Sequence, residues 1–114
     1  MSFEFRTIPN FDRELKKLAK KYPSIKQDVS ELAKSLIENP FQGESLSKNC
    51  FKVRMKITSK MAGKSGGSRV ITCVKVLKER ITLVSIYDKS DMENISDNFL
   101  DQVLADNGLI YTSL

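Results

Sequence analysis

Hydrophobic and polar positions alternate with a period of two in the middle of the chain, from residue 51 to residue 58. The apolar side chains of this segment are Phe51, Val53, Met55 and Ile57, and the polar ones are Lys52, Arg54, Lys56 and Thr58. Because successive side chains of a strand point to opposite faces, the segment predicts a strand with one apolar and one cationic face. Residues 69–77 and 81–87 have β-branched character and predict two further strands, joined as a hairpin through residues 78–80.

The N-terminal part of the chain predicts one strand and two helices. Residues 2–8 alternate over a short stretch and predict a strand, at a sheet edge or in a second layer, that ends at Pro9. Apolar residues then recur at helical spacing over residues 11–22, and again over residues 25–37 after an intervening proline. Two helices joined by so short a break are expected to pack as an antiparallel hairpin on a sheet.

Local signals mark the starts of the predicted helices. Ser24 followed by Gln27 fits a capping box at the start of the second helix. The apolar spacing over residues 95–104 predicts a short last helix, with Ser96 or Asn94 near its N-cap.

The order of these elements predicts the fold class. Residues 41–49 are expected to form a loop between the second helix and the cationic strand. The chain has 114 residues, which suits one domain with a single core. We therefore predict one α+β domain over residues 1–114. It consists of a small antiparallel-rich sheet of about four strands, an N-terminal helical hairpin packed on the sheet, and a short C-terminal helix.

Charge is segregated along the chain. Residues 52–89 contain ten Lys or Arg and only two acids, Glu79 and Asp88, and Asp88 could simply pair with Lys89. Residues 90–114 contain five acids and no Lys or Arg. The net charge is +5 and the pI is near 9.3, which favours a nucleic acid, an anionic surface or an acidic protein as partner.

Several classes of function find no support in the residues. The chain has no His and only two Cys, in strand-like contexts, so the usual zinc ligands are missing and a disulfide is not expected. A phosphate loop ending at Gly63-Lys64-Ser65 would need glycine where Thr58 stands. No apolar run approaches the roughly 20 residues that span a bilayer, and the N-terminus lacks a signal-peptide core. We expect a cytoplasmic protein without membrane contact, metal or small-molecule cofactor.

The cationic strand face allows two interpretations, a solubilising surface or a site for a polyanion. Arginine clamps phosphate and does not deprotonate, whereas a lysine crowded by other cations can accept a proton, so such a cluster can hold and cut RNA. Gly66-Gly67 form either a flexible turn or a close backbone approach to phosphates, with charge from Lys60 and Lys64. Tyr87 is either an ordinary strand-end aromatic residue or one that stacks on a base or handles a proton.

Three segments resemble the RelE/ParE toxins of type II toxin–antitoxin modules, and are nearer to the RelE and HigB-like ribonucleases than to ParE. Cys50-Phe51-Lys52-Val53-Arg54 is similar to the Cys-Tyr-Lys-Ile-Lys/Arg strand of this family. The stretch 64–71, Lys-Ser-Gly-Gly-Ser-Arg-Val-Ile, is similar to its Lys-Ser/Arg-Gly-Gly-x-Arg-hydrophobic stretch. The stretch 85–90, Ser-Ile-Tyr-Asp-Lys-Ser, resembles its last strand, and the order of elements also agrees.

The resemblance implies a RelE-like fold and a metal-independent endoribonuclease that cuts mRNA on the ribosome and inhibits translation. In the implied mechanism Lys52 is the base that activates the ribose 2′-OH, and Arg54 and Arg69 stabilise charge on the phosphate. Lys89 stabilises or protonates the leaving 5′ oxygen. Further RNA contacts are expected from Lys56, Lys60, Lys64, Gly66 and Gly67.

One departure from the family concerns a C-terminal tyrosine of RelE, whose position corresponds to Ile95 here; Tyr87 is the candidate substitute. The implied partners are the ribosome, mRNA and a small cognate antitoxin that covers the basic face with acidic side chains. Two other functions stay open: a ParE-like inhibitor of gyrase, and a non-catalytic RNA-binding module.

Overall fold

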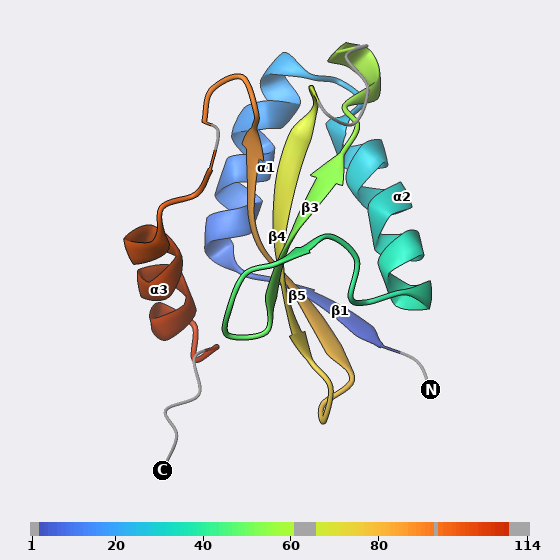
Figure 1. The fold of residues 1–114 in the computed structure, drawn as a ribbon. Coiled ribbons are helices and arrows are strands. Elements are labelled where there is room, and N and C mark those ends of the chain that lie inside the picture. Colours follow the sequence, from blue (N-terminus) through green and yellow to red (C-terminus); the bar gives the residue numbers. More distant parts are fainter. Residues whose placement is uncertain (1–2, 61–65, 93, 110–114) are drawn as a thin grey trace.

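The computed structural model describes residues 3–60, 66–92 and 94–109. Five strands form one sheet in the order β1-β5-β4-β3-β2, and three α-helices and one 3-10 helix, η1, accompany it (Figure 1). The elements are β1 (Glu4–Thr7), α1 (Pro9–Lys21), α2 (Ile25–Glu38), β2 (Glu44–Ser45), β3 (Cys50–Met55), η1 (Thr58–Lys60), β4 (Ser68–Lys75), β5 (Arg80–Asp88) and α3 (Asp97–Asp106).

The sheet is antiparallel except at one edge. β2, β3, β4 and β5 pair with their neighbours antiparallel, whereas β1 pairs with β5 parallel. The α+β class, the helical hairpin and the short C-terminal helix predicted from the sequence are confirmed. The additional strand is β2, two residues within the segment expected to be a loop, and it pairs with Phe51 and Lys52 of β3.

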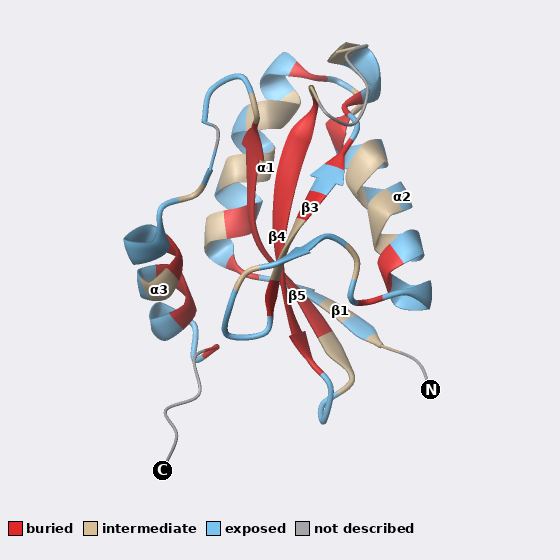
Figure 2. Cartoon of the chain, viewed as in Figure 1, coloured by how far each residue is buried: buried red, intermediate tan, exposed pale blue. Residues whose placement is uncertain are grey.

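The helices lie on opposite faces of the sheet. Tyr22, next to the end of α1, hydrogen-bonds to Asp88 on one face of β5. Gly108, just after α3, accepts a hydrogen bond from Lys75 on the other face of β4. With both faces covered, every residue of β4 is buried, and so is every residue of β5 after Arg80 (Figure 2). These two strands therefore form the centre of the core and hold the residues at their ends in place.

Polar side chains of α1 complete the edge of β5 that β1 leaves open. β1 pairs with β5 only as far as Leu83. Beyond that point Asn10 donates a hydrogen bond from Nδ2 to the carbonyl of Val84 (3.0 Å), and Glu14 accepts one from the amide of Ile86 (3.2 Å). Glu14 therefore occupies the place of a neighbouring strand, which accounts for an acid in a half-buried position.

The two predicted caps have different outcomes. Ser96 is the N-cap of α3, and its Oγ accepts a hydrogen bond from the amide of Phe99 (3.0 Å). The capping box at Ser24 is wrong, because the Ser24 side chain makes no cap hydrogen bond. Its Oγ donates instead to the carboxylate of Asp28 (2.9 Å), and the amide of Ser59 donates to it (2.8 Å), which ties the start of α2 to η1.

Replacing Glu14 with leucine is expected to destabilise the protein by about 1–3 kcal/mol, the usual cost of an unpaired buried polar group. The reason is that the Ile86 amide and the Ser85 hydroxyl, which donates to Glu14 over 2.8 Å, would both lose their acceptor. Glu14→Gln keeps an acceptor oxygen and should cost much less. Urea unfolding at neutral pH, followed by circular dichroism, measures both; equal losses would contradict the edge-completing role.

Candidate nucleic-acid interface

An open groove of about 530 Å³ lies beside the ends of β3 and β4. Four of the basic residues selected from the sequence line it: Lys52 and Arg54 from β3, Arg69 from β4, and Lys89 just after β5. The rest of the lining comes from Val53, Asn94 and the segment 42–44. The structure therefore brings the cationic face of β3, which the period-two pattern predicted, together with a cation of β4 and the one that follows β5.

The sheet register explains this convergence. Arg54 lies opposite Arg69 in the β3–β4 ladder, and Arg69 lies opposite Tyr87 in the β4–β5 ladder. Residues directly opposite each other share a face, so the two guanidinium groups occupy one row across the sheet, and Lys52 lies two residues along β3 on the same face. Like charges so placed destabilise a bare sheet, and an anion in the groove would relieve that cost.

The cations differ in how far they reach into solvent. Arg69 is only 4% exposed and donates a hydrogen bond to the carbonyl of Ser68 (3.1 Å), so its guanidinium belongs to the floor. The Lys52 side chain is 17% exposed. Arg54 is exposed and belongs to the rim, while Lys89 has an intermediate exposure. A ligand in the groove would meet positive charge at two depths.

Two polar residues that the sequence did not point to hold the ammonium group of Lys52. Asn94 accepts a hydrogen bond from it through Oδ1 (2.8 Å), and the carboxylate of Glu44 lies 3.7 Å away. Gly43 has a φ of 96°, and a Cβ there would lie 2.4 Å from the carbonyl oxygen of Lys52, so glycine is required where β2 approaches β3. A single glycine in segment 41–49 was the one available signal of this approach.

Tyr87 lies beneath the groove and not on its surface. It is 5% exposed, so its ring offers little area for a base to stack on. Burial raises the pKa of its hydroxyl, partly opposed by the Ile95 backbone and by the Arg69 guanidinium. The Tyr87 hydroxyl is buried and makes no hydrogen bond with the described residues.

The residues expected to make further RNA contacts are spread over several places. Lys56 is exposed and lines a neighbouring hollow beside α2, together with Arg54. Gly66 is partly exposed, and Gly67 is buried, its carbonyl accepting a hydrogen bond from the amide of Lys89 (3.0 Å). Lys64 lies outside the described residues. Their roles in binding RNA stay predictions.

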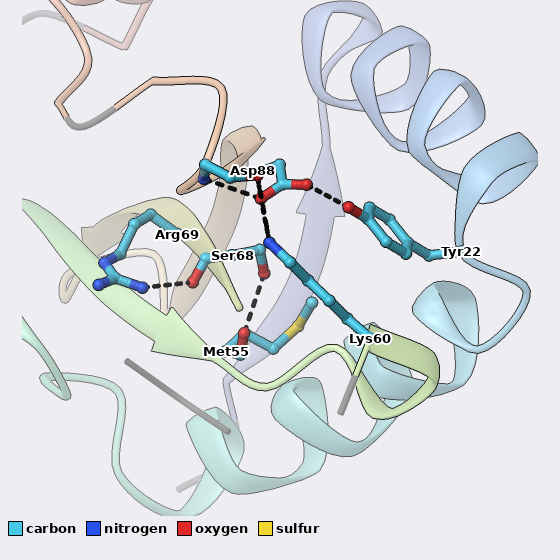
Figure 3. A network of polar contacts seen from close by, with 7 residues as sticks. Tyr22, Met55, Lys60, Ser68, Arg69 and Asp88 are labelled. Atoms are coloured by element: carbon cyan, nitrogen blue, oxygen red, sulfur yellow. Dashed lines mark hydrogen bonds and ion pairs between the residues drawn. The ribbon is translucent and has the colours of Figure 1, made fainter. Parts of the chain in front are cut away.

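Lys60 takes part in a network on the opposite face of the sheet from the groove (Figure 3). Its ammonium lies 2.6 Å from Oδ1 of Asp88, whose side chain is fully buried. Tyr22 donates to Oδ2 of Asp88 (2.5 Å), and the amide and hydroxyl of Ser90 donate to Oδ1. Asp88 is therefore paired with Lys60 and not with Lys89, because alternation along β5 turns Asp88 away from the groove.

The pKa of the Asp88 carboxyl lies well below its ordinary range. Burial alone would raise this pKa, but the hydrogen bonds from Lys60, Tyr22 and Ser90 outweigh burial. The carboxylate is therefore ionised and fully matched by donors, an arrangement that costs little only while every partner is in place.

Within the described ranges 3–60, 66–92 and 94–109, no three His, Cys, Asp or Glu side chains are grouped so as to bind a metal ion. No helix among the same residues has the length and apolar content needed to cross a membrane.

Comparison with known proteins identifies the class of fold. No family model matches the sequence. The structure is similar to a free double arginine-to-alanine mutant of the E. coli toxin RelE, with a TM-score of 0.60, 14% identity, and 94% of this chain and 98% of that chain covered. It is also similar to the isolated E. coli RelE toxin, with a TM-score of 0.54, 16% identity, and 93% and 99% covered. The chain therefore has the RelE fold.

Stability is expected to fall in acid because of Asp88. Its pKa is lower in the folded than in the unfolded chain, so its stabilising contribution is complete above the unfolded value of about 3.9 and is lost as pH falls below it. Urea midpoints between pH 3 and pH 7 measure this dependence. Asp88→Asn should flatten the acid part of the profile; an unchanged slope would show that other carboxyls cause it.

Proposed function

We propose that this protein is the toxin of a type II toxin–antitoxin module and acts as a ribosome-dependent mRNA endoribonuclease without a metal ion. The observation that carries the proposal is the groove lined by Lys52, Arg54, Arg69 and Lys89. The RelE fold and the sequence motifs support it independently. On a surface that serves only solubility, all of these charged groups would be exposed to solvent, whereas here the Arg69 guanidinium is buried in the floor of the groove.

In the proposed reaction the groove binds the scissile ribose-phosphate. Lys52, in its neutral form, takes the proton of the 2′-OH, and the resulting oxyanion attacks the adjacent phosphorus. Arg54 and Arg69 stabilise the charge that grows on the equatorial oxygens, the task that a metal ion performs in other nucleases. Lys89 protonates the leaving 5′ oxygen, so the products are a 2′,3′-cyclic phosphate and a 5′-hydroxyl end. Water is not consumed in this step.

The proposal also assigns partners. An antitoxin would restrain the toxin by covering the groove with acidic side chains, which the four cations favour. Tyr87, opposite Arg69 in the β4–β5 ladder, would contribute by handling a proton, and Lys56 by contacting the RNA backbone.

Expression without the antitoxin is expected to arrest bacterial growth, with cleavage of translated messages mapped by primer extension after brief induction. Arg69→Ala should reduce cleavage roughly 100- to 1,000-fold, as does the loss of one transition-state donor in other enzymes. Lys20→Ala, which removes an exposed cation of α1, is the matched control. Arrest with intact messages and altered DNA supercoiling would favour the gyrase inhibitor, and salt-sensitive RNA binding without cleavage would favour the binding module.

Glu44→Gln is expected to tighten binding of a non-cleavable 2′-deoxy oligonucleotide by roughly two- to fivefold, the range of a partly exposed ion pair. The reason is that Glu44 competes with phosphate for the ammonium of Lys52. Glu38→Gln, at the end of α2, removes an equal charge outside the groove and is the control. Fluorescence anisotropy measures both; equal effects would mean that only net charge matters.

A further inference from the structure

The network around Asp88 contains an ion pair with a fully buried carboxylate, Lys60–Asp88, that the proposed reaction does not use. Its members come from the end of α1 (Tyr22), from η1 (Lys60) and from the turn after β5 (Ser90), and they meet at the end of β5. The cation–π contact of Lys60 with the Tyr22 ring, 5.8 Å from ammonium to centroid, closes the group. A buried ion pair is often replaceable by apolar residues without loss of stability, so stability alone does not account for it.

The position of the network relates it directly to the groove. Asp88 stands between Tyr87 and Lys89, which belong to the groove side, while its own side chain points to the helical side. In the β4–β5 ladder Asp88 lies opposite Ser68, the neighbour of Arg69. The Ser68 hydroxyl donates to the carbonyl of Met55 (3.1 Å), so the same point also holds the end of β3.

The chain leaves the sheet at this place, which makes the anchoring necessary. β5 ends at Asp88, and just beyond it the amide of Lys89 donates a backbone hydrogen bond to the carbonyl of Gly67, the residue that precedes β4. The Asp88 carboxylate also binds the amide of Ser90, on the other side of Lys89. Lys89 thus lies between Asp88 and Ser90, which this hydrogen bond joins, although it is outside the strand. Figure 3 shows that the Arg69 side chain points away from the contacts among Lys60, Asp88 and Tyr22. Those contacts lie on the other face of β4 and β5.

We propose that Asp88 is a positioning residue: with Lys60 and Tyr22 as its partners, it holds the end of β5 so that Lys89 and Arg69 keep the spacing that the proposed reaction needs. The inference rests on the proposed function for its catalytic consequence, but its structural part stands on the contacts alone. Lys60 then acts from behind the sheet and not as an RNA contact.

The test compares Asp88→Asn, Lys60→Met and Lys60→Arg with wild type in the full chain, at a temperature where circular dichroism shows each variant folded. The control is Glu4→Gln, which breaks the ion pair with Arg80 at the opposite end of β5. Three quantities are measured: the amide exchange rate of Lys89, the affinity for a non-cleavable 2′-deoxy oligonucleotide, and the single-turnover cleavage rate on ribosomes.

In Asp88→Asn and Lys60→Met, the Lys89 amide should exchange at least about tenfold faster, since its hydrogen bond to Gly67 opens more often. Cleavage should fall roughly 100-fold, the effect of a displacement near 1 Å, while affinity changes far less. Lys60→Arg should retain most of the wild-type cleavage rate, and Glu4→Gln should cleave at the wild-type rate. This split between rate and affinity, with rescue by arginine, is not expected of a residue that only stabilises the fold.

The inference would be overturned if folded Asp88→Asn or Lys60→Met showed the wild-type cleavage rate and the wild-type exchange rate of the Lys89 amide. It would also be overturned if Lys60→Met and Lys60→Arg cleaved at the same rate. If Asp88→Asn does not fold, Lys60→Met and Tyr22→Phe, which retain the carboxylate, decide the result. If wild type itself fails to cleave, the proposed function fails, and the exchange rate of the Lys89 amide still decides whether Asp88 holds this segment.

Discussion

The hydrogen-bonded ladder that joins β3, β4 and β5 decides which side chains meet in this protein. Its register puts Arg54, Arg69 and Tyr87 in one row on one face and leaves Asp88 and Ser68 on the other. A slip of one residue in any of the three strands would exchange its faces, and in β3 or β4 it would turn a guanidinium group toward the helices. The apolar residues that alternate with these cations prevent such a slip, because they fill the core against α1 and α2.

Two acids among the described residues lie next to this cationic region, Asp88 and Glu44, and they are on opposite sides of the sheet. Asp88, behind the groove, is fully buried and matched by donors, so it contributes to geometry and is not available to a ligand. Glu44, within the groove, is largely exposed and lies beside Lys52, so it lowers the local positive potential without being tied to the core. The buried Asp88 therefore helps to fix the positions of the cations, and the exposed Glu44 lowers the positive potential that they create.

The similarity to RelE at 14–16% identity illustrates what a fold of this size requires. A sheet with a helical hairpin on one face needs the periodicity of its apolar positions more than any particular residue. The edge of β5 shows how an individual sequence adapts such a fold, since Asn10 and Glu14 of α1 provide hydrogen bonds where β1 has already ended.

The sequence by itself determined the helices and the long strands, because periodicity is a property of neighbouring residues. It also singled out Lys52, Arg54, Arg69 and Lys89, through the charge pattern together with the resemblance to the RelE motifs. Only the tertiary structure showed that Lys60 binds Asp88, since the partners are 28 residues apart and a simple pairing with Lys89 was equally compatible with the sequence. It also placed Glu44 and Asn94 at Lys52 and buried Tyr87. These contacts depend on how β2, η1 and the segment before α3 fold back onto the sheet, which local pattern does not encode.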